Sequence, residues 1–180
     1  MKKTGSIAAA IIVLFIIGTI MTQTKVKGLE KDLIQSVKRG DYYTAIDDAD
    51  EIKYQGRNLS KKISKLIEDI KLYLAAVEEL EKHSEMNLGR VKAILDAMNG
   101  SYKKYRTFKS DVKDLKEKVK ELEAYGNEGV KLTKKIEKLL AKGKQEEVRE
   151  LIEEYKSDEK YEYMPTSLRD SLSNYLNQTR

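Results

Sequence analysis

The chain has 180 residues, of which 35 are lysine or arginine and 30 are aspartate or glutamate, so its formal net charge is +5. It contains no cysteine, no tryptophan and one proline. The absence of cysteine excludes disulfide bonds, thiol chemistry and a lipid-modified cysteine anchor. High, balanced charge with a single proline favours helices throughout.

The first predicted element is an uncharged run from Thr4 to Thr24, bounded by Lys3 and Lys25. A helix needs about 20 apolar residues to cross a membrane, and this run meets that length. We therefore predict a signal-anchor transmembrane helix over residues 1–24 and one domain over residues 25–180. Two alternatives stay open, a cleaved secretory signal and a pilin-type leader cut after Gly5.

Flanking charges predict the orientation of this segment. Lys2 and Lys3 favour a cytoplasmic N-terminus, although Lys25, Lys27 and Lys31 nearly balance them on the other side. A short N-terminal tail before a signal-like apolar segment usually stays inside while the following chain is exported. We therefore expect a single-pass membrane protein with its C-terminal domain outside the cytoplasm. Signal cleavage would instead secrete the domain.

The domain is predicted to be all-α, a helical-hairpin or bundle fold of about seven helices. Asp41 and Ser60 are suited to cap the starts of helices. Residues 126–129 are expected to form a turn, a second break is expected at Gly143, and Pro165 precedes the last helix.

Two long apolar stripes run through the middle of the domain, from Ile63 to Leu80 and from Tyr105 to Leu122. Each covers about two and a half heptads, short of the three to four that indicate a coiled coil. The stripes either pack against each other as antiparallel neighbours inside the domain, or one of them dimerises with a second copy. We favour internal packing, and a homo-oligomer stays open.

The segment Gly40-x-Tyr42-x-x-Ala45 resembles the start of the second helix of a tetratricopeptide repeat, and a degenerate copy follows Gly143. In that family, stacked helical hairpins form a superhelix whose concave face binds peptides or partner proteins. The resemblance implies helical hairpins and a protein partner.

Catalytic and metal-binding groups are sparse. His83 is the only histidine, and Glu79 and Glu85 near it make a poor transition-metal site. The chain has no glycine-rich phosphate loop and no nucleophile elbow. We predict no enzyme activity, no cofactor and no metal site.

Two sets of residues are candidates for binding. Tyr42, Tyr43, Tyr161 and Tyr163 are predicted contacts for a protein partner in a membrane or envelope assembly, because tyrosine is effective at interfaces. The alternative is an anionic-polymer or lipid-headgroup site within residues 102–109, where basic and aromatic residues alternate. Its members are Tyr102, Lys103, Lys104, Arg106 and Lys109. If Tyr105 and Phe108 belong to the core, the basic residues form an ordinary solvated face. No nucleic-acid partner is expected.

Overall fold

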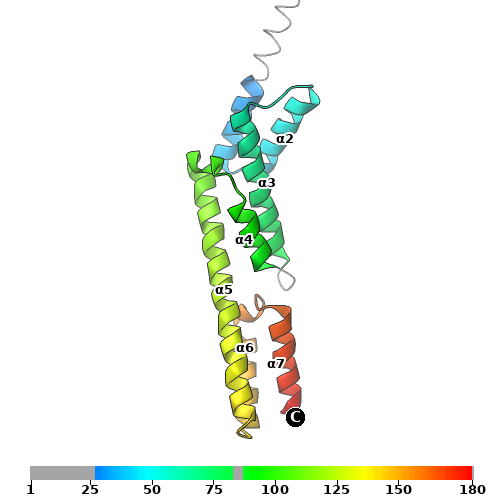
Figure 1. Ribbon diagram of the computed structural model, residues 1–180, viewed down its shortest axis with the longest axis vertical. Coiled ribbons are helices and arrows are strands. Elements are labelled where there is room, and N and C mark those ends of the chain that lie inside the picture. Colours follow the sequence, from blue (N-terminus) through cyan, green and yellow to red (C-terminus); the bar gives the residue numbers. More distant parts are fainter. Residues whose placement is uncertain (1–26, 83–86, 180) are drawn as a thin grey trace, which may run out of the picture. The chain divides into compact units, whose positions relative to one another are not determined.

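The computed structural model describes residues 27–82 and 87–179, and the regular elements in these ranges are helical (Figure 1). The predicted all-α class is confirmed, with seven α-helices in the described ranges. None of these helices is both long and apolar enough to cross a membrane. The predicted anchor over residues 1–24 lies outside the described residues, as do the alternatives for that segment.

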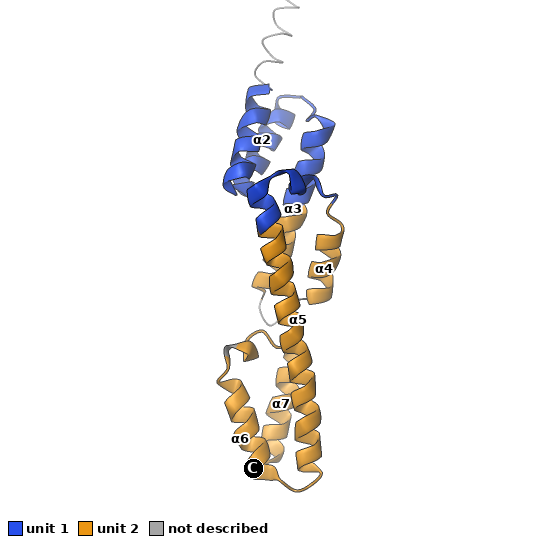
Figure 2. Cartoon of the chain, turned by 90° about the vertical axis from the view of Figure 1, so that its left-hand side faces the viewer, with its two compact units in different colours: residues 1–71, 99–110 blue, residues 72–98, 111–180 orange. Residues whose placement is uncertain are grey.

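The chain divides into two compact units (Figure 2). Within the described ranges, unit 1 comprises residues 27–71 and 99–110, and unit 2 comprises the rest. Helices α3 (Lys61–Glu81) and α5 (Arg106–Leu140) contribute residues to both units. We did not anticipate this division, because two of its boundaries fall inside helices rather than in loops.

Unit 1 begins with a helical hairpin made by residues 27–39 and α2 (Tyr42–Tyr54). Gly40 joins the two helices with a φ of 82°, in the left-handed region that favours glycine. The side chain of Asp41 accepts the backbone N–H of Thr44 at 3.2 Å. This bond starts α2 and confirms Asp41 as its N-cap.

The same turn follows three helices. The N–H groups of Gly40, Gly56 and Gly143 each donate to the carbonyl three residues earlier, and the N–H of the next residue donates to the carbonyl five residues earlier. These paired bonds are a Schellman cap, which satisfies carbonyls at the end of a helix. Both predicted hairpin turns, at Gly40 and Gly143, are therefore present. The relationship to tetratricopeptide repeats stays a prediction.

The core of unit 1 joins this hairpin to the starts of α3 and α5. The rings of Tyr42 and Phe108 have centroids 4.7 Å apart, and the Thr107 hydroxyl donates to the Lys38 carbonyl at 2.8 Å. Full burial of a large apolar side chain stabilises a fold by about 1.5–3 kcal/mol. The buried apolar residues of the unit are Leu33, Val37, Tyr42, Ala45, Ala49, Ile52, Ile63, Leu66, Ile67, Ile70, Tyr105 and Phe108.

In unit 2, α4 (Leu88–Asp96) packs against the parts of α3 and α5 that carry the two predicted stripes. Val91 and Leu95 of α4 form one buried cluster with Ala76 of α3 and Val119 of α5. The stripes are thus covered inside the chain, as we favoured. Their predicted antiparallel arrangement is wrong, because α4 runs in the opposite direction to α3, and α3 and α5 therefore point in the same direction (Figures 1 and 2).

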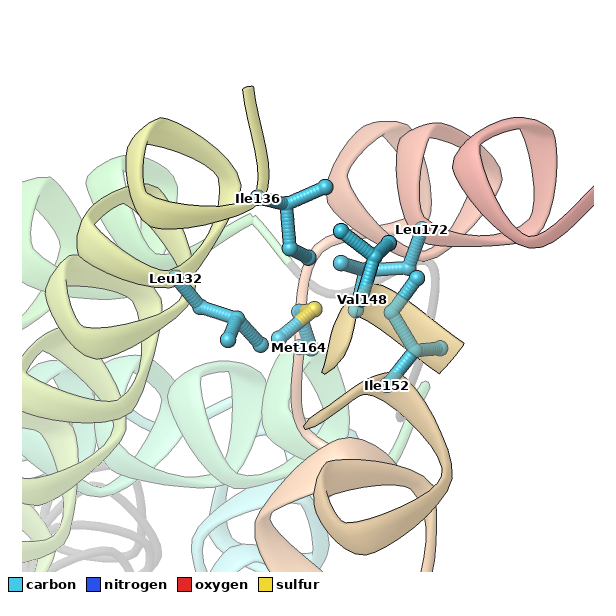
Figure 3. Packing of buried hydrophobic residues seen from close by; sticks show 6 residues of the cluster. All are labelled: Leu132, Ile136, Val148, Ile152, Met164 and Leu172. Atoms are coloured by element: carbon cyan, nitrogen blue, oxygen red, sulfur yellow. The ribbon is translucent and has the colours of Figure 1, made fainter. Parts of the chain in front are cut away.

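The C-terminal part of unit 2 packs α6 (Gln145–Lys156) and α7 (Thr166–Gln178) against the end of α5 (Figure 3). A 3₁₀ turn, η3 (Glu159–Tyr161), lies between them. The side chains that meet in this cluster are Leu132, Ile136, Val148, Ile152, Met164 and Leu172.

The predicted turn at residues 126–129 is wrong, because α5 continues without a break from Arg106 to Leu140. Gly129 lies against the C-terminal cluster, and a Cβ atom there would lie 2.8 Å from Met164 Cε. A glycine inside a helix costs about 1 kcal/mol relative to alanine. The close approach of Met164 and Leu168 to the bare backbone offsets that cost, which sequence alone could not show.

Candidate functional site

The aromatic side chains of residues 102–109 turn toward the core of unit 1. Tyr105 and Phe108 are buried, and the half-buried ring of Tyr102 meets Phe108 edge-on at 5.7 Å. These rings therefore do not lie flat on the surface where a ligand could stack on them. Residues Lys103, Lys104, Arg106 and Lys109 are exposed.

A buried carboxylate fixes the loop that precedes this segment. Asp69 of α3 is fully buried and accepts the N–H groups of Asn99 and Tyr102 at 2.7 and 3.1 Å. The Asn99 side chain in turn donates to the Lys65 carbonyl at 2.8 Å and accepts the Ser101 hydroxyl at 2.6 Å. Hydrogen bonds to a charged acceptor are stronger than neutral ones, so this loop is held firmly against α3.

The loop of residues 99–104 and the first two turns of α3 line an open cleft of about 490 Å³. Four lysines line it, Lys61, Lys62 and Lys65 from α3 and Lys104 from the turn η2 (Ser101–Lys104). The remaining lining residues are Asn99, Gly100 and Ser101. We call this feature the lysine cleft.

Three of these lysines were missed in the sequence, although a signal was present. No acidic residue occurs between Glu51 and Glu68, or between Asp96 and Asp111. These are the two longest acid-free stretches after Glu30. The fold brings them together in unit 1, so the basic surface is shared by two segments rather than confined to residues 102–109.

Of the four tyrosines predicted as partner contacts, two lie in unit 1 and two in unit 2. Tyr42 is only 6% exposed and packs in the core, whereas Tyr43 is 72% exposed. Tyr161 and Tyr163 belong to unit 2 and are half-buried. The ammonium of Lys156 lies 6.0 Å from the centre of the Tyr161 ring, and that of Lys118 lies 5.0 Å from the Tyr163 ring.

Tyr43 shares an outward surface of α2 with a tyrosine that we did not predict. Tyr54 is 88% exposed and lies 11 residues, or three helical turns, after Tyr43. Asp47 and Asp50 occupy the turns between them, and both lie on the outward side. We call this surface, formed by Tyr43, Asp47, Asp50 and Tyr54, the tyrosine face. The opposite side of α2 carries the buried residues Tyr42, Ala45, Ala49 and Ile52.

The tyrosine face is acidic. Partial burial raises the pKa of Asp48 beside it, and the negative charges of Asp32, Asp47 and Asp41 raise that pKa further. Lys53 pairs with Asp50 at 3.2 Å and offsets the negative charge of that aspartate. Like charges held close together favour the approach of a cation, so this surface is suited to a basic partner.

Of the three residues weighed as metal ligands in the sequence, only Glu79 lies in the described ranges, and it forms ion pairs. The carboxylate of Glu79 accepts the Lys82 ammonium at 2.8 Å and lies 3.7 Å from Arg90 Nε. The hydrogen bond from Lys82 lowers the pKa of Glu79. His83 and Glu85 lie outside the described residues, and within the described ranges no group of three potential metal ligands occurs.

Comparison with known proteins identifies no relative: no family model, no curated protein and no solved structure matches this chain.

Proposed function

We propose that this protein is a non-catalytic, membrane-anchored docking module whose tyrosine face binds a basic segment of a partner protein. The observation that carries this proposal is the pairing of Tyr43 and Tyr54, 72% and 88% exposed, on one side of α2 with acidic residues between them. The anchor is the apolar run of residues 4–24, and the partner belongs to the same membrane or envelope assembly.

The chemistry of the face favours a basic partner. Exposed tyrosine rings attract lysine and arginine through their π-electrons, by about 0.5–1 kcal/mol at an exposed site. The carboxylates of Asp47 and Asp50 add attraction for the same cations and raise the rate of encounter. Tyrosine is also enriched among the few residues that contribute most of the binding energy in protein interfaces. Both Tyr43 and Tyr54 are free of the packing that occupies Tyr42.

The test places a photo-reactive phenylalanine analogue at Tyr43 or Tyr54 of the full chain in living cells. We expect irradiation to join both variants to the same discrete partner. Combining either analogue with Asp47→Lys should reduce the yield of that adduct several-fold, because the substitution reverses a charge on the face. The adduct mass and the crosslinked peptide identify the partner and show whether the attached segment is basic.

The matched control carries the analogue at Lys142, an exposed residue of unit 2. Equal labelling of the same protein from Lys142, or an attached segment rich in acidic residues, would contradict the proposal.

The yield of crosslinking at the tyrosine face should depend on pH. Because the pKa of Asp48 is raised in the folded protein, this carboxylate becomes protonated at a higher pH than an ordinary aspartate does. Crosslinking should therefore decline with acidification.

A further inference from the structure

We propose that the lysine cleft binds the phosphate groups of anionic membrane lipids. This site is separate from the tyrosine face in its residues and its charge, since Lys61, Lys62, Lys65 and Lys104 line it. The phosphate chemistry follows from the cleft itself. The choice of lipid as its source rests on the proposed membrane anchor.

The lining of the lysine cleft contains four lysines and no acidic residue. Lys92, Lys118 and Lys144 each lie 2.7–3.2 Å from a glutamate, whereas no acidic side chain lines the lysine cleft. The four cleft lysines form no ion pair with any acid in the described ranges. Four like charges on one concave surface repel one another and concentrate positive potential. An anion bound between them relieves that repulsion.

The lysine cleft is built on a framework that hydrogen bonds hold in place. Asp69 and Asn99 hold the loop against α3 through bonds of 2.7–3.1 Å, so Lys104 is carried on backbone that is already ordered. Ser101 and Gly100 line the cleft beside it. Lysine binds phosphate as a compact charge with three donors. A fixed framework lowers the conformational entropy lost when a ligand binds.

The lysine cleft lies near the part of the chain that follows the predicted anchor. The side chain of Glu30 accepts the N–H of Ser60 at 2.9 Å. Ser60 directly precedes Lys61 and Lys62, and Glu30 follows the end of the apolar run, Thr24, by only six residues. The start of α3 therefore lies beside the part of the chain that connects to the predicted anchor. Lysines close to an anionic bilayer are attracted to it over about one Debye length.

The test uses the full chain in uncharged maltoside micelles, titrated with phosphatidylglycerol while the backbone amide signals of Gly100 and Ser101 are followed by NMR. We expect saturable shifts at these two residues, no comparable shifts with phosphatidylcholine, and weaker binding as NaCl is raised. A Lys62→Gln, Lys65→Gln, Lys104→Gln variant should bind at least tenfold more weakly, since each lysine contributes roughly fivefold.

The matched control replaces three exposed lysines of α5 in unit 2 by glutamine, Lys134, Lys135 and Lys138, and so removes the same charge. It should retain the original affinity. Equal weakening in the control would overturn the proposal, because net charge alone would then explain the binding. A response to inorganic polyphosphate without one to phosphatidylglycerol would overturn the assignment to lipid. Neither result bears on the tyrosine face, which is tested with other residues.

Discussion

At the residue scale, Asp69 shows how a single buried group organises a surface. Its carboxylate accepts two backbone N–H groups and has no exposed area. A buried charge is tolerated only when hydrogen bonds replace the water that it loses. The loop of residues 99–104 supplies those bonds, and the cleft lysine Lys104 is positioned as a consequence.

We predict that Asp69→Ala lowers the free energy of unfolding by about 3 kcal/mol, because both N–H groups lose a charged acceptor. Asp69→Asn should cost less, since its side-chain oxygen can still accept one of them. Urea unfolding followed by circular dichroism measures both values. Glu68→Ala, at the neighbouring exposed position, serves as the control and should change stability by less than about 0.5 kcal/mol. A loss at Asp69 no larger than this would show that the two bonds contribute little.

The exposed basic residues of the site could be predicted from the sequence, whereas the buried residue that supports them could not. Exposure of Lys103, Lys104, Arg106 and Lys109 agrees with an ordinary helical surface and could be anticipated from their spacing. The role of Asp69 could not, because a lone aspartate in a Lys/Glu-rich helix looks like any solvated residue. The contribution of α3 to the cleft depends on a contact between segments about 30 residues apart, and helical periodicity carries no information about such contacts.

At the element scale, most helices could be predicted because their signals are local. Asp41 caps α2, Ser60 receives the N–H of Ile63 at 3.4 Å at the start of α3, and Gly143 ends α5 with a positive φ. The error at residues 126–129 arose because a glycine pair predicts a turn by local preference. Packing against Met164 and Leu168 overrides that preference at Gly129.

The two glycines of α5 should respond differently to alanine. At Gly126 no atom beyond the adjoining residues and the local helix backbone lies within 4 Å of the position that a Cβ would occupy, so Gly126→Ala should stabilise the protein by about 1 kcal/mol. At Gly129 the added carbon would lie 2.8 Å from Met164 Cε and 3.1 Å from Leu168 Cδ1. We expect Gly129→Ala to be roughly 1–2 kcal/mol less stable than Gly126→Ala, because the core must shift.

Thermal and urea unfolding of the two single variants measure this difference. Shortening the neighbour in a Gly129→Ala, Met164→Val variant should recover part of the loss relative to Met164→Val alone, since the Cε atom that causes the clash is removed. Equal stabilisation by both alanines would mean that Met164 moves aside at no cost, and that helix propensity alone governs this part of α5.

At the scale of the whole molecule, the predicted anchor over residues 4–24 would determine where the two proposed binding surfaces operate. The described part of unit 1 starts at residue 27, which is helical and lies two residues after Lys25. A membrane anchor would hold the lysine cleft and the tyrosine face near a bilayer and thereby raise their effective concentration for partners there. An unanchored domain would have to reach the same partners by diffusion.

We predict that a protease unable to enter intact cells digests residues 27–180 of the full chain, and that the membrane fraction retains a fragment containing Met1. The reasons are the length of the run, which is sufficient to span a bilayer, and the basic residues Lys2 and Lys3, which favour the cytoplasm. Mass analysis of the retained fragment reports in one sample whether the segment is cleaved and which side the domain occupies. A cytoplasmic protein expressed in the same cells controls for leakage.

Digestion only after the cells are opened would place the domain in the cytoplasm, reverse the predicted orientation, and direct the search for a basic partner to cytoplasmic complexes. Loss of residues 1–24 from the mature chain would remove the anchor, and with it the reason for assigning the cleft phosphate to a lipid of the same membrane.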